Sequence, residues 1–270
     1  MLKTRVLLVA IFAATILLRM PAAASAPTAD TGFLNRSVSV DGVERRYQVY
    51  VPSGYQRSTP LPVILALHGG GEYGTDGISQ TEGGLARAIR QHPDRFNALV
   101  VFPQSPPGGT PGFQGLGERI ALTELDKVMS EFNADASRVY LTGKSMGGNG
   151  AWYLAYHHAN RFAALLVVCG FVEEFTGTTS GTHYPPIVAT SAVDPFAAVA
   201  KNIRFVPIWI FHGDADRTVS VEQSRQMFSA LKAIGANVQY TELPGVPHNA
   251  WDLAYDKADV FTWLFQQRRR

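Results

Sequence analysis

The stretch Thr142–Gly150, TGKSMGGNG, contains the pattern Gly143-x-Ser145-x-Gly147. It follows the short, apolar and β-prone run Arg138–Leu141, and the residues after it are typical of a helix. G-x-S-x-G at a strand-to-helix turn is typical of a nucleophile elbow, which holds its serine in a strained backbone conformation. Glycines at the flanking positions let strand and helix approach each other. The pattern predicts a nucleophilic Ser145; the alternative is a glycine-rich turn with an idle serine.

Two stretches also have features of phosphate-binding loops. Gly143-Lys144-Ser145 looks like the end of a P-loop, but the glycine required five positions before its Gly-Lys pair is replaced by Arg138. Residues 69–74 match G-x-G-x-x-G. A dinucleotide site would also need an acid at the end of the next strand, and residues 98–102 run into Pro103-Gln104 instead. Nucleotide binding is therefore not favoured.

The N-terminus has the pattern of a secretory signal peptide. A basic start precedes the apolar run Val6–Leu18 and the small residues 22–26, which contain A-x-A sites. We expect residues 1–24 to be the signal peptide, with cleavage after Ala24 rather than Ala26, and the mature protein to be secreted or periplasmic. The apolar run is too short for a good transmembrane span, so an uncleaved anchor is the less favoured alternative.

The charge of the chain is nearly balanced once the leader is removed. Residues 1–24 hold three of the 24 basic residues and none of the 22 acidic ones, which leaves a net charge of −1. A balance of this kind favours neither nucleic acid nor an anionic membrane as a partner.

Residues 25–270 are enough for a single domain with a large core. Cys169 is the only cysteine, so no intramolecular disulfide can form and an exported fold must rest on that core. Its apolar surroundings in the sequence are typical of a buried structural thiol. The chain has no HExxH motif, no Cys/His cluster and no paired-carboxylate spacing, so we expect neither a metal nor another cofactor.

Strand signals alternate with helix signals, which predicts a mostly parallel, twisted α/β sheet with helices on both faces. A hairpin whose turn starts at Asp41-Gly42 supplies an antiparallel N-terminal edge. Residues 170–205 carry no sustained strand signal before a possible helix near 194–201, and we interpret them as a small cap insertion. The expected strands are 36–40, 46–51, 63–67, 98–102, 138–142, 163–169, 208–211 and 238–243; the expected helices include 85–90, 119–132, 221–234 and 255–267.

Four chemically active residues lie just past predicted strands: His68, Ser145, Asp216 and His248. In open α/β sheets the site lies at the carboxyl ends of the strands, so their positions agree with the motif independently of it. A serine hydroxyl needs a base to take its proton, and the base needs an orienting acid.

His248 lies on the loop after the last strand, where the base belongs; the alternative is a surface-loop histidine. His212 is expected to be structural, hydrogen-bonded at its turn. For the acid we favour Asp216 over Asp214, because Asp216 lies further out on a loop that must reach the histidine loop. Asp214 is expected to bind backbone N–H groups of its own loop.

The oxyanion hole needs two backbone N–H groups aimed at the developing negative charge. We expect one from Met146, the residue after the serine. The other is expected from the glycines after His68, with Gly70 favoured and Gly71 second, because glycine allows close approach of the backbone to a substrate. A glycine turn needed only for packing is the alternative.

The sequence resembles the serine esterases of the α/β-hydrolase superfamily, and within it a bacterial exported group often described as predicted peptidases or phospholipase/carboxylesterase-like proteins. This resemblance implies an α/β-hydrolase fold and a catalytic triad of Ser145, Asp216 and His248. Tyr73 stands where an arginine is expected, and Ser220 where a proline is usual, which leaves substrate preference open. The matching stretches are residues 67–72, 143–152, 161–164, 211–216 and 247–252.

Two further residues are candidates for substrate binding. Trp251, three residues after His248, follows the family pattern and either walls the acyl pocket or packs at the start of a helix. Glu72 either contacts substrate or caps the next turn.

The sequence thus predicts an exported serine carboxylesterase that forms an acyl-enzyme on Ser145. The substrate would be an ester, either of a small molecule or borne by a polymer. A serine peptidase of the same fold is one alternative, although the resemblance implies that such peptidases carry a larger gating domain. A non-catalytic binding protein on this fold is the other.

Overall fold

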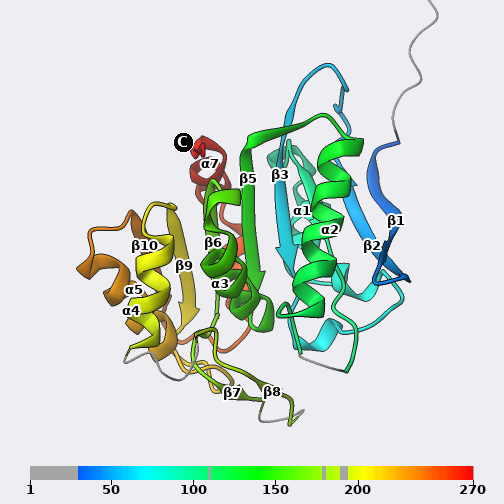
Figure 1. Cartoon of the computed structure of the whole chain (residues 1–270). Coiled ribbons are helices and arrows are strands. Elements are labelled where there is room, and N and C mark those ends of the chain that lie inside the picture. The colour runs from blue at the N-terminus through cyan, green and yellow to red at the C-terminus, as the bar shows by residue number, and fades with distance from the viewer. Residues whose placement is uncertain (1–29, 109–110, 178–180, 189–193, 270) are drawn as a thin grey trace, which may run out of the picture.

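A computed structural model describes residues 30–108, 111–177, 181–188 and 194–269 of the chain. The predicted signal peptide lies outside the described residues. An eight-stranded sheet has the order β1-β2-β4-β3-β5-β6-β9-β10, and a two-stranded sheet pairs β7 with β8 (Figure 1). The strands are β1 Gly32–Val40, β2 Val43–Val51, β3 Leu61–Leu67, β4 Leu99–Phe102, β5 Ala134–Lys144, β6 Ala164–Val168, β7 Phe175–Thr176, β8 His183–Tyr184, β9 Ile208–Gly213 and β10 Val238–Leu243.

Helices cover both faces of the sheet, as predicted. Side chains of α2, α3, α4 and α5 pack in one buried cluster, and those of α1, α6 and α7 pack in the other. The α-helices are α1 Gly84–Gln91, α2 Leu116–Glu131, α3 Met146–His158, α4 Pro195–Ile203, α5 Glu222–Ala233, α6 Trp251–Asp256 and α7 Ala258–Gln266; short 3₁₀ turns are η1 Gly70–Glu72, η2 Ser79–Thr81, η3 Pro93–Arg95 and η4 Ala159–Arg161.

The N-terminal hairpin forms the predicted antiparallel edge. Asp41 and Gly42 have φ angles of 52° and 77°, the left-handed region required by a two-residue turn that matches the twist of its strands. Strand β2 also pairs antiparallel with β4. From β4 through β3, β5, β6 and β9 to β10, neighbouring strands of the sheet pair in parallel. Strands β3, β4 and β6 are buried along their whole length, which explains their continuous apolar sequences.

The prediction of one C-terminal helix at 255–267 is wrong, because the helical segment begins earlier and is interrupted. The chain forms α6 and α7, with Lys257 in an extended conformation between them. The two helices bury different surfaces, because α6 packs on α1, where Arg87 meets Asp252 at 2.8 Å, while α7 packs on β6. One straight helix could not make both contacts.

The described part of residues 170–205 holds only the two-residue strands β7 and β8 and the helix α4. Strands β7 and β8 lie beyond the carboxyl ends of the large sheet's strands (Figure 1). Helix α4 begins at Pro195 after Asp194, whose side chain accepts the N–H of Ala197. In the described residues, no helix is both long and apolar enough to span a membrane.

Candidate active site

Ser145 occupies a strained turn between β5 and α3. Its φ and ψ angles are 54° and −118°, a positive φ that residues with a side chain rarely adopt, and its N–H donates to the Val168 carbonyl at 2.9 Å. A Cβ on Gly143 would overlap the carbonyl oxygen of Gly147, and one on Gly147 would overlap that of Leu67. The two glycines therefore allow the tight turn that projects the serine from the sheet.

Ser145, His248 and Asp216 form a continuous chain of hydrogen bonds. Ser145 Oγ lies 2.8 Å from His248 Nε2, and His248 Nδ1 lies 2.6 Å from Asp216 Oδ2. Because a carboxylate only accepts, Nδ1 carries the proton of the neutral ring and Nε2 is free to accept the serine proton. The Asp216 side chain is fully buried, while 22% of the His248 side chain is exposed. The structure thus brings together three residues that lie far apart in the sequence.

Asp216 is held as a carboxylate by hydrogen bonds from several directions. Oδ1 accepts the N–H groups of Thr218 at 2.8 Å and Val219 at 2.9 Å, and Oδ2 accepts from His212 Nε2 at 3.2 Å as well as from His248. Burial raises the pKa of Asp216, but the hydrogen bonds from His212, His248 and Val219 outweigh burial and lower it overall. The group stays ionised where it faces the histidine.

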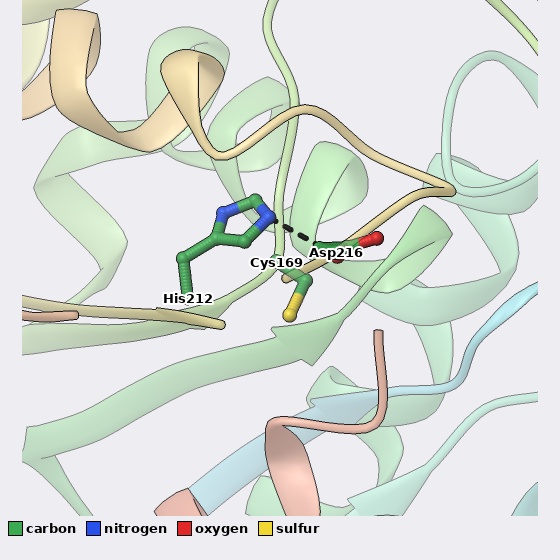
Figure 2. Close-up of side chains that lie close together, drawn as sticks. All are labelled: Cys169, His212 and Asp216. Atoms are coloured by element: carbon green, nitrogen blue, oxygen red, sulfur yellow. Dashed lines mark hydrogen bonds and ion pairs between the residues drawn. The ribbon is translucent and has the colours of Figure 1, made fainter. Parts of the chain in front are cut away.

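His212 has the structural position expected for it, with a contact that the sequence did not reveal. Its Nε2–H is shared between Asp216 Oδ2 and the Val219 carbonyl at 3.1 Å, so Nδ1 accepts the Ser224 hydroxyl at 2.7 Å. Figure 2 shows the ring directed at Asp216, with Cys169 beside it. His212, in β9, thus hydrogen-bonds the same Asp216 oxygen that accepts from His248.

Cys169, His212 and Asp216 are the one group in the described residues whose ligand atoms, all within 4.8 Å of one another, have the spacing of a metal site (Figure 2). Their polar atoms already have partners, because Cys169 donates to the His248 carbonyl at 3.5 Å and the other two residues are bonded as described above. Burial and the nearby Asp216 raise the pKa of the Cys169 thiol, and metal ligation needs the thiolate. The arrangement fits a hydrogen-bonded cluster better than a metal site.

Asp214 differs from its expected role. Its Oδ1 accepts the N–H of Gly245 at 2.6 Å, and Gly245 belongs to the histidine loop rather than to the loop of Asp214. The two loops leave neighbouring parallel strands, β9 and β10, so a carboxylate at the end of one reaches the turn after the other. Asp214 therefore joins the acid loop to the base loop without touching His248.

The two expected oxyanion donors border the same cavity. Met146 is the first residue of α3, where a helix leaves its N–H groups without internal acceptors, and Gly70 begins the 3₁₀ turn η1. His68 holds that turn through two hydrogen bonds. Its Nδ1–H donates to the Gly69 carbonyl at 2.7 Å, and its Nε2 accepts the Ser105 N–H at 2.9 Å. Burial lowers the pKa of His68 to about 4, so the ring is neutral near pH 7.

A cavity of about 460 Å³ opens beside Ser145 and His248. The insertion supplies much of its apolar wall through Phe171, Phe175 and Tyr184. Trp251 supplies another part and meets the His248 ring edge-on, with ring centres 5.2 Å apart. The full lining is Gly69, Gly70, Gly71, Glu72, Lys144, Ser145, Met146, Phe171, Phe175, Gly177, Tyr184, Thr218, His248 and Trp251.

Glu72 lines this cavity. It also forms an ion pair that the sequence did not reveal. Its Oε1 lies 2.6 Å from Lys144 Nζ, and that ammonium lies 4.6 Å from the centre of the Trp251 ring. The signal in the sequence was a lysine that ends an apolar strand directly before the serine, with a lone acid in the glycine loop after the neighbouring strand.

Tyr73, one of the two departures from the family pattern, borders a second cavity of about 630 Å³. Its hydroxyl donates to that of Tyr184 at 3.4 Å, so the tyrosine pair stands between the two cavities. Ser220, the other departure, accepts the Glu222 N–H at 3.3 Å at the start of α5.

Comparison with known proteins places this geometry in a family. Residues 38–249 match the model of the family Esterase, described as "Putative esterase". Acetylxylan esterase A of Emericella nidulans is 30% identical over 202 residues, covering 64% of this chain and 62% of the relative. A protein of Arthroderma benhamiae described as an uncharacterized secreted protein is 27% identical over 212 residues, covering 71% of this chain and 22% of the relative.

A solved structure described as that of a thermostable esterase superposes with a TM-score of 0.72 at 28% identity, covering 88% of this chain and 63% of the other. The chain spans less than two thirds of the length of each of these three proteins. The sheet order, the elbow and the covering helices are those of an α/β-hydrolase fold. Because the family model extends from β1 to the histidine loop, the protein belongs to this esterase family.

Proposed function

We propose that the protein is a serine carboxylesterase that hydrolyses carboxylic esters through an acyl-enzyme on Ser145. The observation that carries the proposal is the unbroken chain of hydrogen bonds from Ser145 Oγ through His248 to Asp216, opening on a cavity. Along the chain, nucleophile, acid and base follow one another in the order typical of this fold.

In the proposed reaction, Ser145 Oγ bonds to the ester carbonyl carbon as His248 Nε2 takes its proton. The carbonyl oxygen becomes an oxyanion that the N–H groups of Gly70 and Met146 stabilise. The bond to the alcohol oxygen then breaks, and His248 gives its proton to that oxygen. Water repeats the sequence on the acyl-enzyme and releases the acid. Apart from the ester and water, every group that takes part belongs to the chain, so the proposed reaction requires no cofactor.

The cavity supports an ester substrate with an apolar or aromatic group beside the reacting carbonyl. Its walls are largely the rings of Phe171, Phe175, Tyr184 and Trp251. The similarity to an acetylxylan esterase supports a wider set of candidates, from acetyl esters of small molecules to esters borne by polymers.

We further propose that residues 1–24 are a removable signal peptide and that residues 25–270 form one α/β-hydrolase domain. The basic and apolar pattern of the leader supports export to the periplasm or beyond the cell. Similarity to a protein described as secreted agrees with it. Residues 170–205 act as a small cap that shapes the pocket without supplying a catalytic group.

Replacement of the nucleophile tests the proposal. Ser145→Ala removes one oxygen, so the fold should persist while turnover of a short-chain nitrophenyl ester falls by roughly 10⁶-fold, as for other serine nucleophiles. Ser37→Ala, an exposed serine on β1, is the matched control and should keep wild-type turnover.

A fluorophosphonate should label the wild type and the control but not Ser145→Ala. Labelling that persists in Ser145→Ala would refute the assigned nucleophile. A wild type that binds esters without turnover would support a binding protein instead. Faster cleavage of an anilide than of the ester with the same acyl group would indicate a peptidase.

A further inference from the structure

Lys144 and Glu72 face each other at the junction of the two loops that carry the proposed oxyanion donors. Lys144 is the last residue of β5 and directly precedes Ser145, while Glu72 ends the turn that begins at Gly70. Their Nζ and Oε1 atoms are 2.6 Å apart, and only 9% and 16% of the two side chains are exposed. The pair therefore bridges the oxyanion loop and the nucleophile elbow.

Neighbouring groups hold the lysine in one position. A Cβ on Gly84 would lie 3.3 Å from its Cδ and Cε, and one on Gly69 would lie 3.7 Å from its Cε, so the aliphatic stem runs through a channel walled by glycines. At its end, the ammonium lies 4.6 Å from the centre of the Trp251 ring, within range of a cation–π contact. Trp251 in turn contacts the ring of His248.

The contacts of Glu72 are made within the protein, although the residue also lines the cavity. Oε1 is occupied by the ammonium, and Oε2 is buried without a hydrogen-bond partner in the described structure. Oε2 lies 3.9 Å from His68 Nδ1, but that N–H is directed to the Gly69 carbonyl and the ring is neutral. The carboxylate does not cap the next turn, η2, and its contact with substrate stays a prediction.

Stability alone gives no reason for such a pair. Moving two charges out of water costs about as much as their attraction returns, and buried ion pairs can often be replaced by apolar side chains without loss. Here one carboxylate oxygen remains unsatisfied as well. What the pair does supply is a fixed separation between two loops that must present their N–H groups to the same atom.

We propose that the Glu72–Lys144 ion pair is a positioning device for the oxyanion hole. It holds the turn bearing Gly70 against the elbow bearing Met146, so that both N–H groups point at the oxyanion before substrate arrives. The contact through Trp251 extends the same alignment to His248. This inference rests on the proposed ester hydrolysis at Ser145, and it assigns both residues to positioning rather than to chemistry.

Charge removal from either side tests the pair. Lys144→Met keeps a stem of similar length in the glycine channel, and Glu72→Gln keeps the shape of the carboxylate. Each should lower kcat by about 10- to 100-fold, less than the 10²–10³-fold cost of removing an oxyanion donor outright. KM for a short-chain ester should change by no more than about twofold, because the lost interaction is made in the transition state.

Lys144→Met should have the larger effect, since it leaves an unpaired carboxylate beside the site of developing negative charge. The double variant Glu72→Gln/Lys144→Met should lose less activity than the product of the two single losses, because the residues act as one unit. Independent, multiplying effects would overturn the proposed partnership.

An oxyanion analogue separates positioning from a merely structural role. A trifluoromethyl ketone adds to the serine and places an alkoxide in the hole, so its inhibition constant should rise by the same factor as kcat/KM falls. Arg138→Met is the matched control, because Arg138 pairs with Asp135 at 2.6 Å on the same strand, with 21% and 19% of the two side chains exposed, and lies remote from the cavity. That variant should change the melting temperature without changing kcat or the inhibition constant.

Three further outcomes would overturn the inference. The first is a folded Lys144→Met and a folded Glu72→Gln with wild-type kcat and inhibition. The second is an equal loss of kcat in Arg138→Met, which would indicate general destabilisation. The third is a wild type that neither turns over esters nor reacts with a fluorophosphonate, in which case the proposed function fails with it. A labelled, active wild type with unaffected pair variants would refute the positioning role alone.

Discussion

At the scale of the residue, the arrangement of Asp214 and Asp216 shows how two similar side chains on one loop acquire different tasks. Asp216 is buried and accepts from His248 and His212, whereas Asp214 is exposed and accepts from the backbone of Gly245. Only Asp216 can hold the imidazole in the tautomer that a base requires. Asp214 instead sets the distance between the two loops.

This difference predicts opposite effects of the same substitution. Asp216→Asn should lower kcat by roughly 10⁴-fold, because an amide no longer favours the tautomer with a free Nε2. Asp214→Asn keeps an acceptor for Gly245 but loses its charge, so kcat should fall by less than about tenfold and the protein should lose about 1 kcal/mol of stability. Ester kinetics and melting curves of both variants check the prediction; the reverse ranking in kcat would make Asp214 the acid.

The three residues that hydrogen bonds join at the candidate site could be predicted from local patterns in the sequence. Ser145 is marked by its glycines, and His248 and Asp216 by their places after predicted strands. The pairing of Lys144 with Glu72 could not be identified, because it depends on how two loops 72 residues apart in the sequence meet across neighbouring strands. No spacing rule in a single sequence encodes such a contact.

At the scale of the element, α2 has a feature that its sequence pattern does not explain. Glu124, an acidic residue, is fully buried beside Leu125 and Val128 on the face of α2 that packs against the core. Both carboxyl oxygens of Glu124 are buried without a partner in the described structure. Burial raises the pKa of Glu124 well above its ordinary value.

The raised pKa predicts that Glu124→Gln stabilises the protein at alkaline pH. A group whose pKa is raised on folding contributes its stability below the pKa of the unfolded chain and loses it as pH rises through the folded value. At pH 8 the variant should therefore have a higher free energy of unfolding than wild type, because the amide carries no charge to bury.

The difference between the two proteins should shrink towards pH 4, where both side chains are neutral. Urea unfolding at pH 4, 6 and 8 measures it. Glu118→Gln on the same helix is the control; Glu118 is paired with His158 at 2.6 Å, and its replacement should give no stabilisation at pH 8. A pH-independent gap between Glu124→Gln and wild type would contradict the prediction.

Most elements follow from local periodicity and turn residues, and those that do not follow depend on long-range packing. The hairpin at Asp41-Gly42 and the end of α5 before Gly235, at φ 71°, could be predicted from the residues that favour turns there. The break at Lys257 was not, because it reflects docking of α6 on α1, and the β7–β8 pair has only two residues on each side. Such short pairs leave no periodic signal.

At the scale of the whole molecule, the site is assembled from the carboxyl ends of four strands, and the same assembly makes it sensitive to acid. His68 lies beneath the oxyanion loop, 3% exposed, with both ring nitrogens bonded to backbone groups. Protonation would place an unpaired donor against the Ser105 N–H. His68 can therefore accept the Ser105 N–H only while the ring is neutral.

The last prediction follows from this histidine. Its pKa falls from the ordinary 6.5 to about 4 on folding, so the unfolded chain binds the proton more tightly between these values. The stability that neutral His68 contributes is then fully present above about pH 6.5 and is lost as pH falls towards about 4, by about 2–3 kcal/mol between pH 7 and pH 4.5.

His68→Gln should be less stable at pH 7 but should lose correspondingly less over this interval, while His183→Gln, whose histidine is exposed, should follow wild type. Urea unfolding at pH 7, 5.5 and 4.5 compares the slopes, and their difference isolates His68 because the other titratable groups, Glu124 among them, are the same in both proteins. Parallel slopes for wild type and His68→Gln would mean that the acid sensitivity of the fold originates elsewhere.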